Sequence, residues 1–190
     1  RRTSDLRFNP ITIDHPGVES RICGWFLWKH RLRGLGYWSF MNWGSNPWAT
    51  PRPNNQNGEY SLIYPPTEDN TSIAYGANGH RFLPSIRLEL IRDGLEDYEY
   101  FRLLNGSQQP QPDQTSAADA LVSQIVSSDG VAVNRDGGMM CNLRRLAGLY
   151  LGGEISSIPG ISPESRHSRA DGAPGNYYIN FQDPAGNPTG

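Results

Sequence analysis

The chain has 190 residues, of which 36% are hydrophobic and 11% aromatic, and its formal net charge is −2. This length suits one domain and falls short of the roughly 250 residues of a complete (β/α)8 barrel. The sequence has no apolar run near 18 residues and no basic excess. These features argue against a membrane span and against a nucleic-acid partner.

The first predicted elements are a helix followed by a strand. Asp14 is expected to cap the helix, and apolar residues recur at helical spacing from Val18 to Leu32. Gly34 ends this pattern, and residues 35–43 (LGYWSFMNW) then form an aromatic run with little polar alternation. Such a run is typical of a strand buried on both faces of a parallel sheet. Together the two elements predict an α/β fold.

Three more helices and one short strand are predicted downstream. The strand covers residues 59–64, and the helices cover 85–104, 116–127 and 138–151. The second helix is expected to end at Asn105 and Gly106. Its predicted apolar face consists of Ile86, Leu90, Leu95, Tyr98, Phe101 and Leu104. After Gly153 the sequence is rich in Ser, Pro and Gly, so residues 154–190 are interpreted as a linker or the start of a further module.

An acidic stretch at residues 92–99 looks catalytic at first sight. On a helix, however, its acids share faces with one another, and Arg87, Arg92 and Arg102 are spaced to pair with them. A solvated, ion-paired helix face is therefore the preferred interpretation. Asp14 is similarly placed to pair with Arg21.

The cysteines and histidines show no ligand spacing. Cys23 and Cys141 both lie in apolar helical patterns, which favours two buried free thiols over a single disulfide. The four histidines form no cluster with other ligand residues. We therefore expect no metal and no cofactor.

All five tryptophans lie between residues 25 and 48. Trp25 and Trp28 fall on the apolar face of the first helix and are predicted to be core residues. Trp38 and Trp43 lie on the predicted strand and Trp48 lies in the loop after it, and an α/β protein binds its ligand at the carboxyl ends of its strands. Aromatic faces beside an amide suit a sugar, because the rings stack on its CH groups and the amide binds its hydroxyl or acetamido groups. The predicted sugar-binding residues are Trp38, Asn42, Trp43 and Trp48; the alternative is that they cap the core.

Taken together, these segments resemble the C-terminal part of the glycoside hydrolase family 123 catalytic domain and the related family called domain of unknown function 4091. The similarity covers about residues 10–105, and its most specific part is the run SIRLELIRDGLEDYEY at 85–100. The matching pieces, in order, are 13–16 (IDHP), Arg21, Trp25, 28–29 (WK), Gly34, 37–39 (YWS), Asn42, Trp43, 62–65 (LIYP), 85–89 (SIRLE) and 92–99 (RDGLEDYE).

The resemblance implies the C-terminal portion of a (β/α)8 TIM-type barrel, with residues 14–33, 35–43 and 85–104 as its last helix, strand and helix. The domain division is then residues 1–105 for the barrel segment, 106–153 for a helical extension and 154–190 for the tail. The rest of the barrel would be the partner of this segment.

The resemblance also implies hydrolysis of β-linked N-acetylhexosamine glycans, with N-acetylgalactosamine as the expected sugar, in a secreted or periplasmic bacterial protein. Family members use a substrate-assisted retaining mechanism, with an Asp-Glu dipeptide on an earlier strand. This sequence has no Asp-Glu dipeptide. The segment is therefore expected to supply sugar-pocket wall, to contain no catalytic residue and to be inactive in isolation. The alternative is a non-catalytic carbohydrate-binding or extracellular structural protein.

Overall fold

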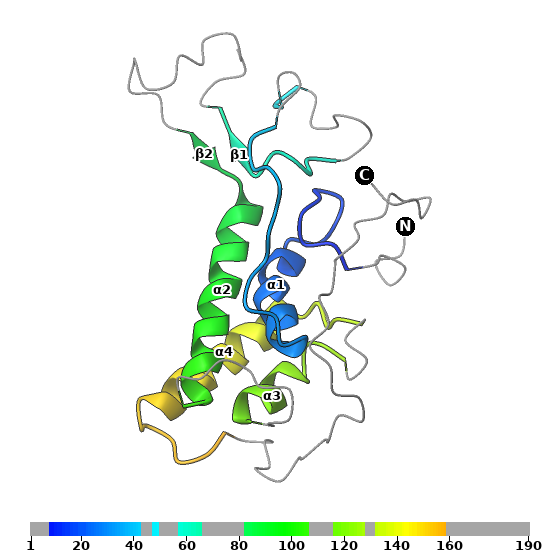
Figure 1. Cartoon of the computed structure of the whole chain (residues 1–190). Helices are drawn as coiled ribbons and strands as arrows, with labels where there is room; N and C mark the ends of the chain where they lie inside the picture. Colours follow the sequence, from blue (N-terminus) through cyan, green and yellow to red (C-terminus); the bar gives the residue numbers. More distant parts are fainter. Residues whose placement is uncertain are drawn as a thin grey trace.

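A computed structural model of the chain describes residues 8–42, 47–49, 57–65, 82–106, 116–127 and 132–158. Within them the helices are α1 (Val18–Lys29), α2 (Ile86–Leu104), α3 (Ala117–Val122) and α4 (Gly137–Leu151). Two short strands, β1 (Ile63–Tyr64) and β2 (Leu83–Pro84), pair antiparallel beside the start of α2 (Figure 1). None of the helices in this described part is long and apolar enough to cross a membrane.

Helices α1 and α2 lie side by side and run in the same direction (Figure 1). Their contacts follow both helices in order, from Gly24 against Gly94 to Trp28 against Phe101 further along. A Cβ atom added to Gly24 would lie 1.8 Å from the carbonyl oxygen of Gly94. One added to Gly94 would lie 2.2 Å from the carbonyl oxygen of Arg21. The two backbones therefore touch, which only glycine allows at both positions.

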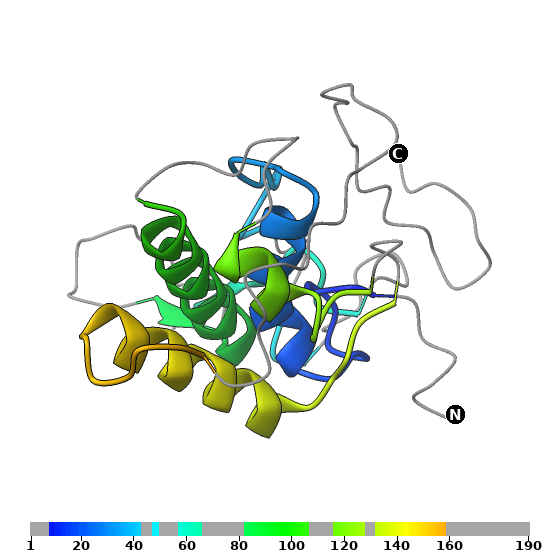
Figure 2. The same ribbon diagram turned by 90° about the horizontal axis from the view of Figure 1, so that it is seen from below.

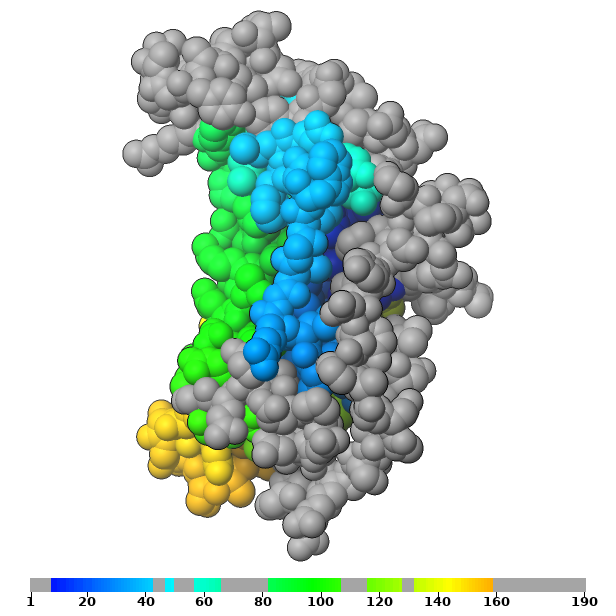
Figure 3. Space-filling view, viewed as in Figure 1, coloured from blue at the N-terminus to red at the C-terminus, as the bar shows by residue number. Residues whose placement is uncertain are grey.

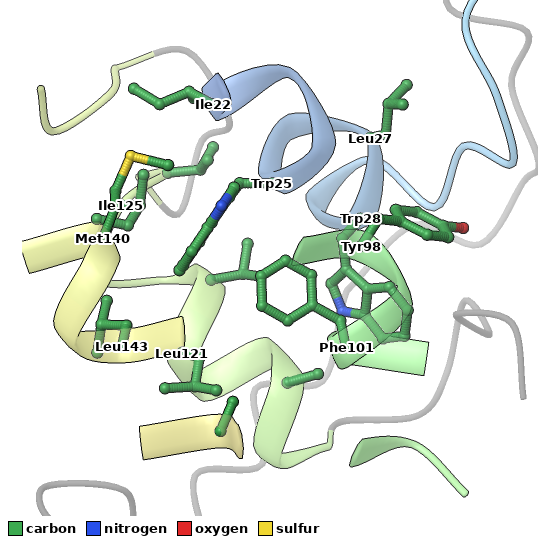
Figure 4. Packing of buried hydrophobic residues seen from close by; sticks show 14 of the residues in the cluster. Ile22, Trp25, Leu27, Trp28, Tyr98, Phe101, Leu121, Ile125, Met140 and Leu143 are labelled. Carbon is green, nitrogen blue, oxygen red and sulfur yellow. The ribbon is translucent and has the colours of Figure 1, made fainter. Parts of the chain in front are cut away.

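The hydrophobic core lies between these two helices and helices α3 and α4 (Figure 4). Trp25 meets Phe101 edge to face with ring centroids 4.7 Å apart, and Trp28 meets Tyr98 at 5.3 Å. Edge-to-face aromatic pairs of this kind add stabilisation beyond their buried area. The predictions that Trp25 and Trp28 are core residues are confirmed.

Helices α3 and α4 close the other side of this core (Figure 2). Ser116 begins α3 with a capping box, in which its hydroxyl accepts from the backbone of Asp119 and the Asp119 side chain accepts from the backbone of Ser116. The Asp119 carboxylate also accepts a 3.0 Å hydrogen bond from Trp28 Nε1, which ties α3 to α1. The Asp136 side chain caps α4. The predicted third and fourth helices are thus present, the third ending earlier than expected.

The segment after α1 runs back along the helix pair toward β1, over the surface seen in Figure 3. Residues 35–42 contain no regular strand, and the doubly buried strand predicted there is not formed. The single bridge in this stretch pairs Met41 with Ser61. A central strand of a parallel sheet requires a hydrogen-bonding neighbour on each side. Among the described residues this segment has one neighbour, at its end.

Three further expectations about the helices need correction. Gly17 rather than Asp14 is the N-cap of α1 and makes no side-chain cap, while the Asp14 carboxylate accepts from Asn57 Nδ2. On α2, Ile86 is 69% exposed and Leu95 is 45% exposed, so neither belongs to the buried face. Their places are taken by buried polar residues described below. The predicted end of α2 at Asn105 is confirmed.

Candidate functional site

The residues predicted to bind sugar follow α1 and are held by the loop that leads into β1. The backbone N–H of Asn42 donates to the carbonyl of Tyr60 (3.0 Å), and that of Leu62 donates to the carbonyl of Phe40 (3.0 Å). These hydrogen bonds flank the bridge between Met41 and Ser61. Residues 40–42 and 60–62 therefore form one short antiparallel unit, which we call the site hairpin.

Trp38 and Asn42 are both exposed beside this site hairpin. The Trp38 side chain is 66% exposed, and one edge of its ring meets the ring of Tyr60 with centroids 4.7 Å apart. Asn42 is exposed, while its backbone is fixed to Tyr60. The exposed Asn42 amide therefore lies on the site hairpin, and the large exposed Trp38 side chain contacts the same hairpin through Tyr60.

Trp48 lies in the next described stretch, residues 47–49, and contacts the end of the segment 60–65. Its indole N–H donates to the carbonyl of Pro65 (3.1 Å), and its ring lies 4.8 Å from that of Tyr64. Trp43, the fourth predicted residue, lies outside the described residues. The structure thus attaches Trp38, Asn42 and Trp48 to one stretch, residues 60–65, and leaves the sugar-binding role of each as a prediction.

A buried arginine holds this stretch in place. The Arg87 guanidinium donates to the carbonyls of Gly58 (2.7 Å) and Ser61 (2.7 Å), to that of Ile11 and to the Tyr64 hydroxyl (3.3 Å). Burial lowers the pKa of Arg87, since it penalises the charged form. The expected pairing of Arg87 with the acids of its own helix is therefore wrong. Instead it joins two chain segments, at Ile11 and at residues 58–64, to the first turn of α2.

A carboxyl group lies in the same region. Glu59 is 6% exposed and follows Gly58, whose φ of 73° is a left-handed conformation suited to glycine. Its backbone carbonyl accepts a hydrogen bond from the Tyr37 hydroxyl. Burial raises the pKa of the Glu59 carboxyl. Burial also raises the pKa of Tyr37, and the negative charge of Glu59 raises the Tyr37 pKa further. The two groups are thus close together, with the Glu59 side chain buried and Tyr37 half-buried.

The acidic stretch of α2 divides into two parts. Arg92 pairs with Glu89 and Arg102 with Glu99 on the exposed side, which confirms the predicted ion-paired face for these residues. Asp97 differs, because it is buried.

The Asp97 carboxylate accepts from Arg21 Nε (2.7 Å), from Arg21 Nη2 (3.1 Å) and from Trp25 Nε1 (2.8 Å). Arg21 therefore pairs across the helix seam, and its expected pairing with Asp14 is wrong. Burial lowers the pKa of Arg21, but the hydrogen bonds and the negative charge of Asp97 raise it by more, so the net shift of the pKa is upward. This pair holds the two helices together.

No group of three or more His, Cys, Asp or Glu side chains suited to a metal ion occurs in the described ranges. Cys23 is buried, as predicted, but Cys141 is exposed, and both thiols are free. A shallow depression of about 440 Å³ lies beside Cys141, lined by residues including Arg21, Tyr100 and Arg144. The guanidinium groups of Arg21 and Arg144 there contact Asp97 and Glu96.

The sequence model of the catalytic domain of glycoside hydrolase 123 matches residues 8–104. The chain belongs to this family. The matched range contains α1, α2, both strands and all four predicted sugar-binding residues. No curated protein matches the chain in a sequence comparison.

Membership of the glycoside hydrolase 123 family indicates a glycan as the class of substrate. Sequence reasoning missed Glu59 and Arg87 as residues of this region. A lone Glu after a glycine carries no periodic signal, and Arg87 lies in a helix whose acids offer nearer partners. The signal in the sequence for both is their position relative to the family-like stretches: Glu59 lies three positions before 62–65, and Arg87 lies within 85–89.

Proposed function

We propose that this chain is part of a glycoside hydrolase that acts on β-linked N-acetylhexosamine glycans, with N-acetylgalactosamine as the sugar, by a substrate-assisted retaining mechanism. Membership of the glycoside hydrolase 123 catalytic-domain family supports the proposal most strongly. Its contribution in this chain is the wall of the sugar pocket, formed by Trp38, Asn42, Trp43 and Trp48. We further propose that the protein is secreted or periplasmic, where glycans of this kind are encountered.

The presentation of Trp38 supports the sugar-binding part. An indole face that is mostly exposed leaves a large apolar surface in water, and covering it with the CH groups of a pyranose is favourable. The ring of Tyr60 meets that of Trp38 edge to face, and the backbone hydrogen bonds of residues 40 and 42 hold the segment that follows Trp38. Asn42 on the same unit offers both a donor and an acceptor to polar groups of the sugar.

We also propose that the described elements are the last helix, strand and helix of a (β/α)8 barrel. The arrangement of α1, the returning segment and α2 favours this interpretation, because parallel helices joined by an antiparallel return are the connectivity of an α/β unit. Strands supplied by the remainder of the barrel would give residues 35–42 the hydrogen-bonding neighbours that they lack among the described residues.

The chemistry of such a reaction places two demands on carboxyl groups. One must hold the acetamido group whose oxygen attacks the anomeric carbon, and one must protonate the leaving oxygen. The adjacent acids of α2 do not meet these demands, since Asp97 is bound by Arg21 and Trp25, and Glu96 is bound by Arg144. We therefore assign the catalytic pair to the remainder of the barrel and predict that the 190-residue chain alone has no hydrolase activity.

Kinetics of the complete gene product test the assignment. Trp38→Ala and Asn42→Ala should raise KM for a chromogenic β-N-acetylgalactosaminide by about 10-fold or more, as loss of a stacking or hydrogen-bonding contact of 1–3 kcal/mol implies. Tyr150→Ala is the matched control, because Tyr150 is also an exposed aromatic residue but lies on α4, outside the family match. Wild-type kinetics in the Trp38 and Asn42 variants would refute the placement of the pocket.

A carbohydrate-binding protein without hydrolase activity is the second candidate, and the absence of an Asp-Glu dipeptide from the sequence favours it. Binding of N-acetylgalactosamine, followed by saturation-transfer NMR, separates the two. Binding that depends on Trp38, with no turnover by the complete gene product, would support this candidate. Turnover by the 190-residue chain itself would refute the assignment of the catalytic pair to the remainder of the barrel.

A further inference from the structure

Glu59 is a buried acid whose carboxyl group has no hydrogen-bond or ion-pair partner among the described residues. None of the hydrogen bonds or ion pairs of the described residues involves its carboxyl oxygens; only its backbone carbonyl is bound, by the Tyr37 hydroxyl. The neighbouring guanidinium of Arg87 is occupied by backbone carbonyls and by Tyr64. Glu59 therefore differs from the other two buried acids in this part of the chain, Glu19 and Asp97, which are both bound by arginine.

Burying a carboxyl group without a partner is unfavourable. The ionised form loses its hydration, and even the neutral form loses hydrogen bonds to water. The Glu59 oxygens are not fully enclosed, so their loss of hydration is partial, but no hydrogen-bonding group among the described residues replaces it. A position that keeps such a group despite its cost is a candidate for binding, because a ligand can supply the missing hydrogen bond.

The carboxyl oxygens of Glu59 can be reached from outside. Among the described residues the one fully enclosed side-chain polar atom without a partner is Ser61 Oγ, so the Glu59 oxygens retain some contact with solvent. Glu59 directly precedes Tyr60, whose ring meets Trp38 and whose carbonyl binds the backbone of Asn42. The unpaired carboxyl group is thus next in sequence to the residue that supports both Trp38 and Asn42.

We propose that Glu59 is a further sugar-binding residue, whose carboxyl group binds a hydroxyl group of the pyranose that rests against Trp38. This inference rests on the proposed function, because it names a specificity contact in the same pocket. The hydroxyl donates when the carboxyl group is ionised, and accepts or donates when it is neutral. In either form the sugar replaces the hydration that burial removes. A sugar lacking that hydroxyl leaves the carboxyl group unsatisfied and is therefore disfavoured.

The test combines variants of the complete gene product with a set of chromogenic N-acetylgalactosaminides that each lack one hydroxyl group. For the wild type, removal of one particular hydroxyl should lower kcat/KM by about 10- to 100-fold. Glu59→Ala should lower kcat/KM for the parent glycoside by a similar factor, mostly through KM. Loss of the same hydroxyl should then have little further effect in this variant, since its partner is already absent.

Two further variants guard against a structural explanation. Glu59→Gln keeps a hydrogen-bonding group of the same size and should retain more activity than Glu59→Ala. Glu154→Ala removes an exposed acid that lies outside the family match and should leave kcat/KM unchanged. Circular dichroism of each variant confirms that the fold is kept.

The outcomes separate this proposal from the one on which it rests. If Trp38→Ala raises KM but Glu59→Ala does not, or if every deoxy sugar loses as much activity in Glu59→Ala as in the wild type, the role of Glu59 is refuted and the pocket stands. If the wild type neither hydrolyses nor binds any of these sugars, the pocket itself is refuted, and Glu59 with it.

Discussion

Replacing Gly94 with alanine should destabilise the protein by separating α1 from α2. The added Cβ would lie 2.2 Å from the carbonyl oxygen of Arg21, where contacts below 3.0 Å essentially never occur. The obstacle is backbone rather than a flexible side chain, so the helices must move apart by about 1 Å. Overpacking of a core costs about 1–3 kcal/mol and sometimes more, and a rigid backbone obstacle belongs at the upper end.

Alanine also favours a helix over glycine by about 1 kcal/mol, which offsets part of this cost. We therefore expect a net loss of about 2 kcal/mol or more, equivalent to a fall in Tm of about 4–8 °C for a chain of this size. Separation would also strain the hydrogen bonds from Arg21 and Trp25 to Asp97 across the seam.

Urea unfolding followed by tryptophan fluorescence measures the effect, since Trp25 and Trp28 lie at this seam. Gly148→Ala is the matched control, because its Cβ would meet Tyr100 at 3.5 Å, an ordinary contact, in the interior of α4. It should keep or increase stability by up to about 1 kcal/mol. Equal stability of Gly94→Ala and the wild type would refute close backbone contact between the helices.

Three other predictions concern buried acids. Asp97→Ala should lower the free energy of unfolding by about 3–5 kcal/mol, measured in urea, because it leaves the buried charge of Arg21 unpaired. Burial raises the pKa of Glu19, but hydrogen bonds from His15, the backbone of Asn9 and Arg135 lower it by more, so the net pKa lies below the usual 4.5. The ionised Glu19 therefore contributes its full stabilisation of the fold above about pH 4.5, and this contribution is lost as the pH falls through the lower pKa of the folded state. The stability difference between wild type and Glu19→Gln should therefore shrink from pH 7 to pH 3; a constant difference would contradict this. Burial raises the pKa of Glu59, so the wild type loses stability as the pH rises above 4.5, and Glu59→Gln should be the more stable protein at pH 7 but not at pH 4.

The core helices could be predicted from the sequence, because apolar residues at helical spacing identify the buried face of a helix wherever that face packs against apolar residues of other elements. Trp25 and Trp28 follow this rule. The pattern failed on α2, where the exposed Ile86 was expected inside and the buried Asp97 outside. Asp97 can be buried because it pairs with Arg21 on α1. Arg21 lies 76 positions away in the sequence, and the spacing of residues within one helix contains no information about such a partner.

The close contact of Gly24 with Gly94 was equally hidden. Glycine within a helix is unfavourable by local propensity, so from sequence alone it only weakens the prediction of a helix. The reason for it appears once α1 is placed against α2. The strand predicted at residues 35–43 failed for a related reason, since a strand depends on neighbours that a local pattern does not provide. The predicted sugar-binding residues lie on this strand and just after its carboxyl end, and their role stays a prediction.

Helix α2 links the core to the candidate site. Asp97 fixes one part of the helix to α1, and Arg87, ten positions earlier or about 15 Å along the axis, binds the carbonyls of Ile11, Gly58 and Ser61. Residues 40–42 hydrogen-bond in turn to residues 60–62 of this Arg87-bound loop. A loop-rich sequence with 21 glycines and 15 prolines thus has one rigid path from its core to Trp38 and Asn42. Because that path begins at the helix seam, a substitution that shifts α2 along α1 should also misplace the sugar-binding residues, although it touches none of them.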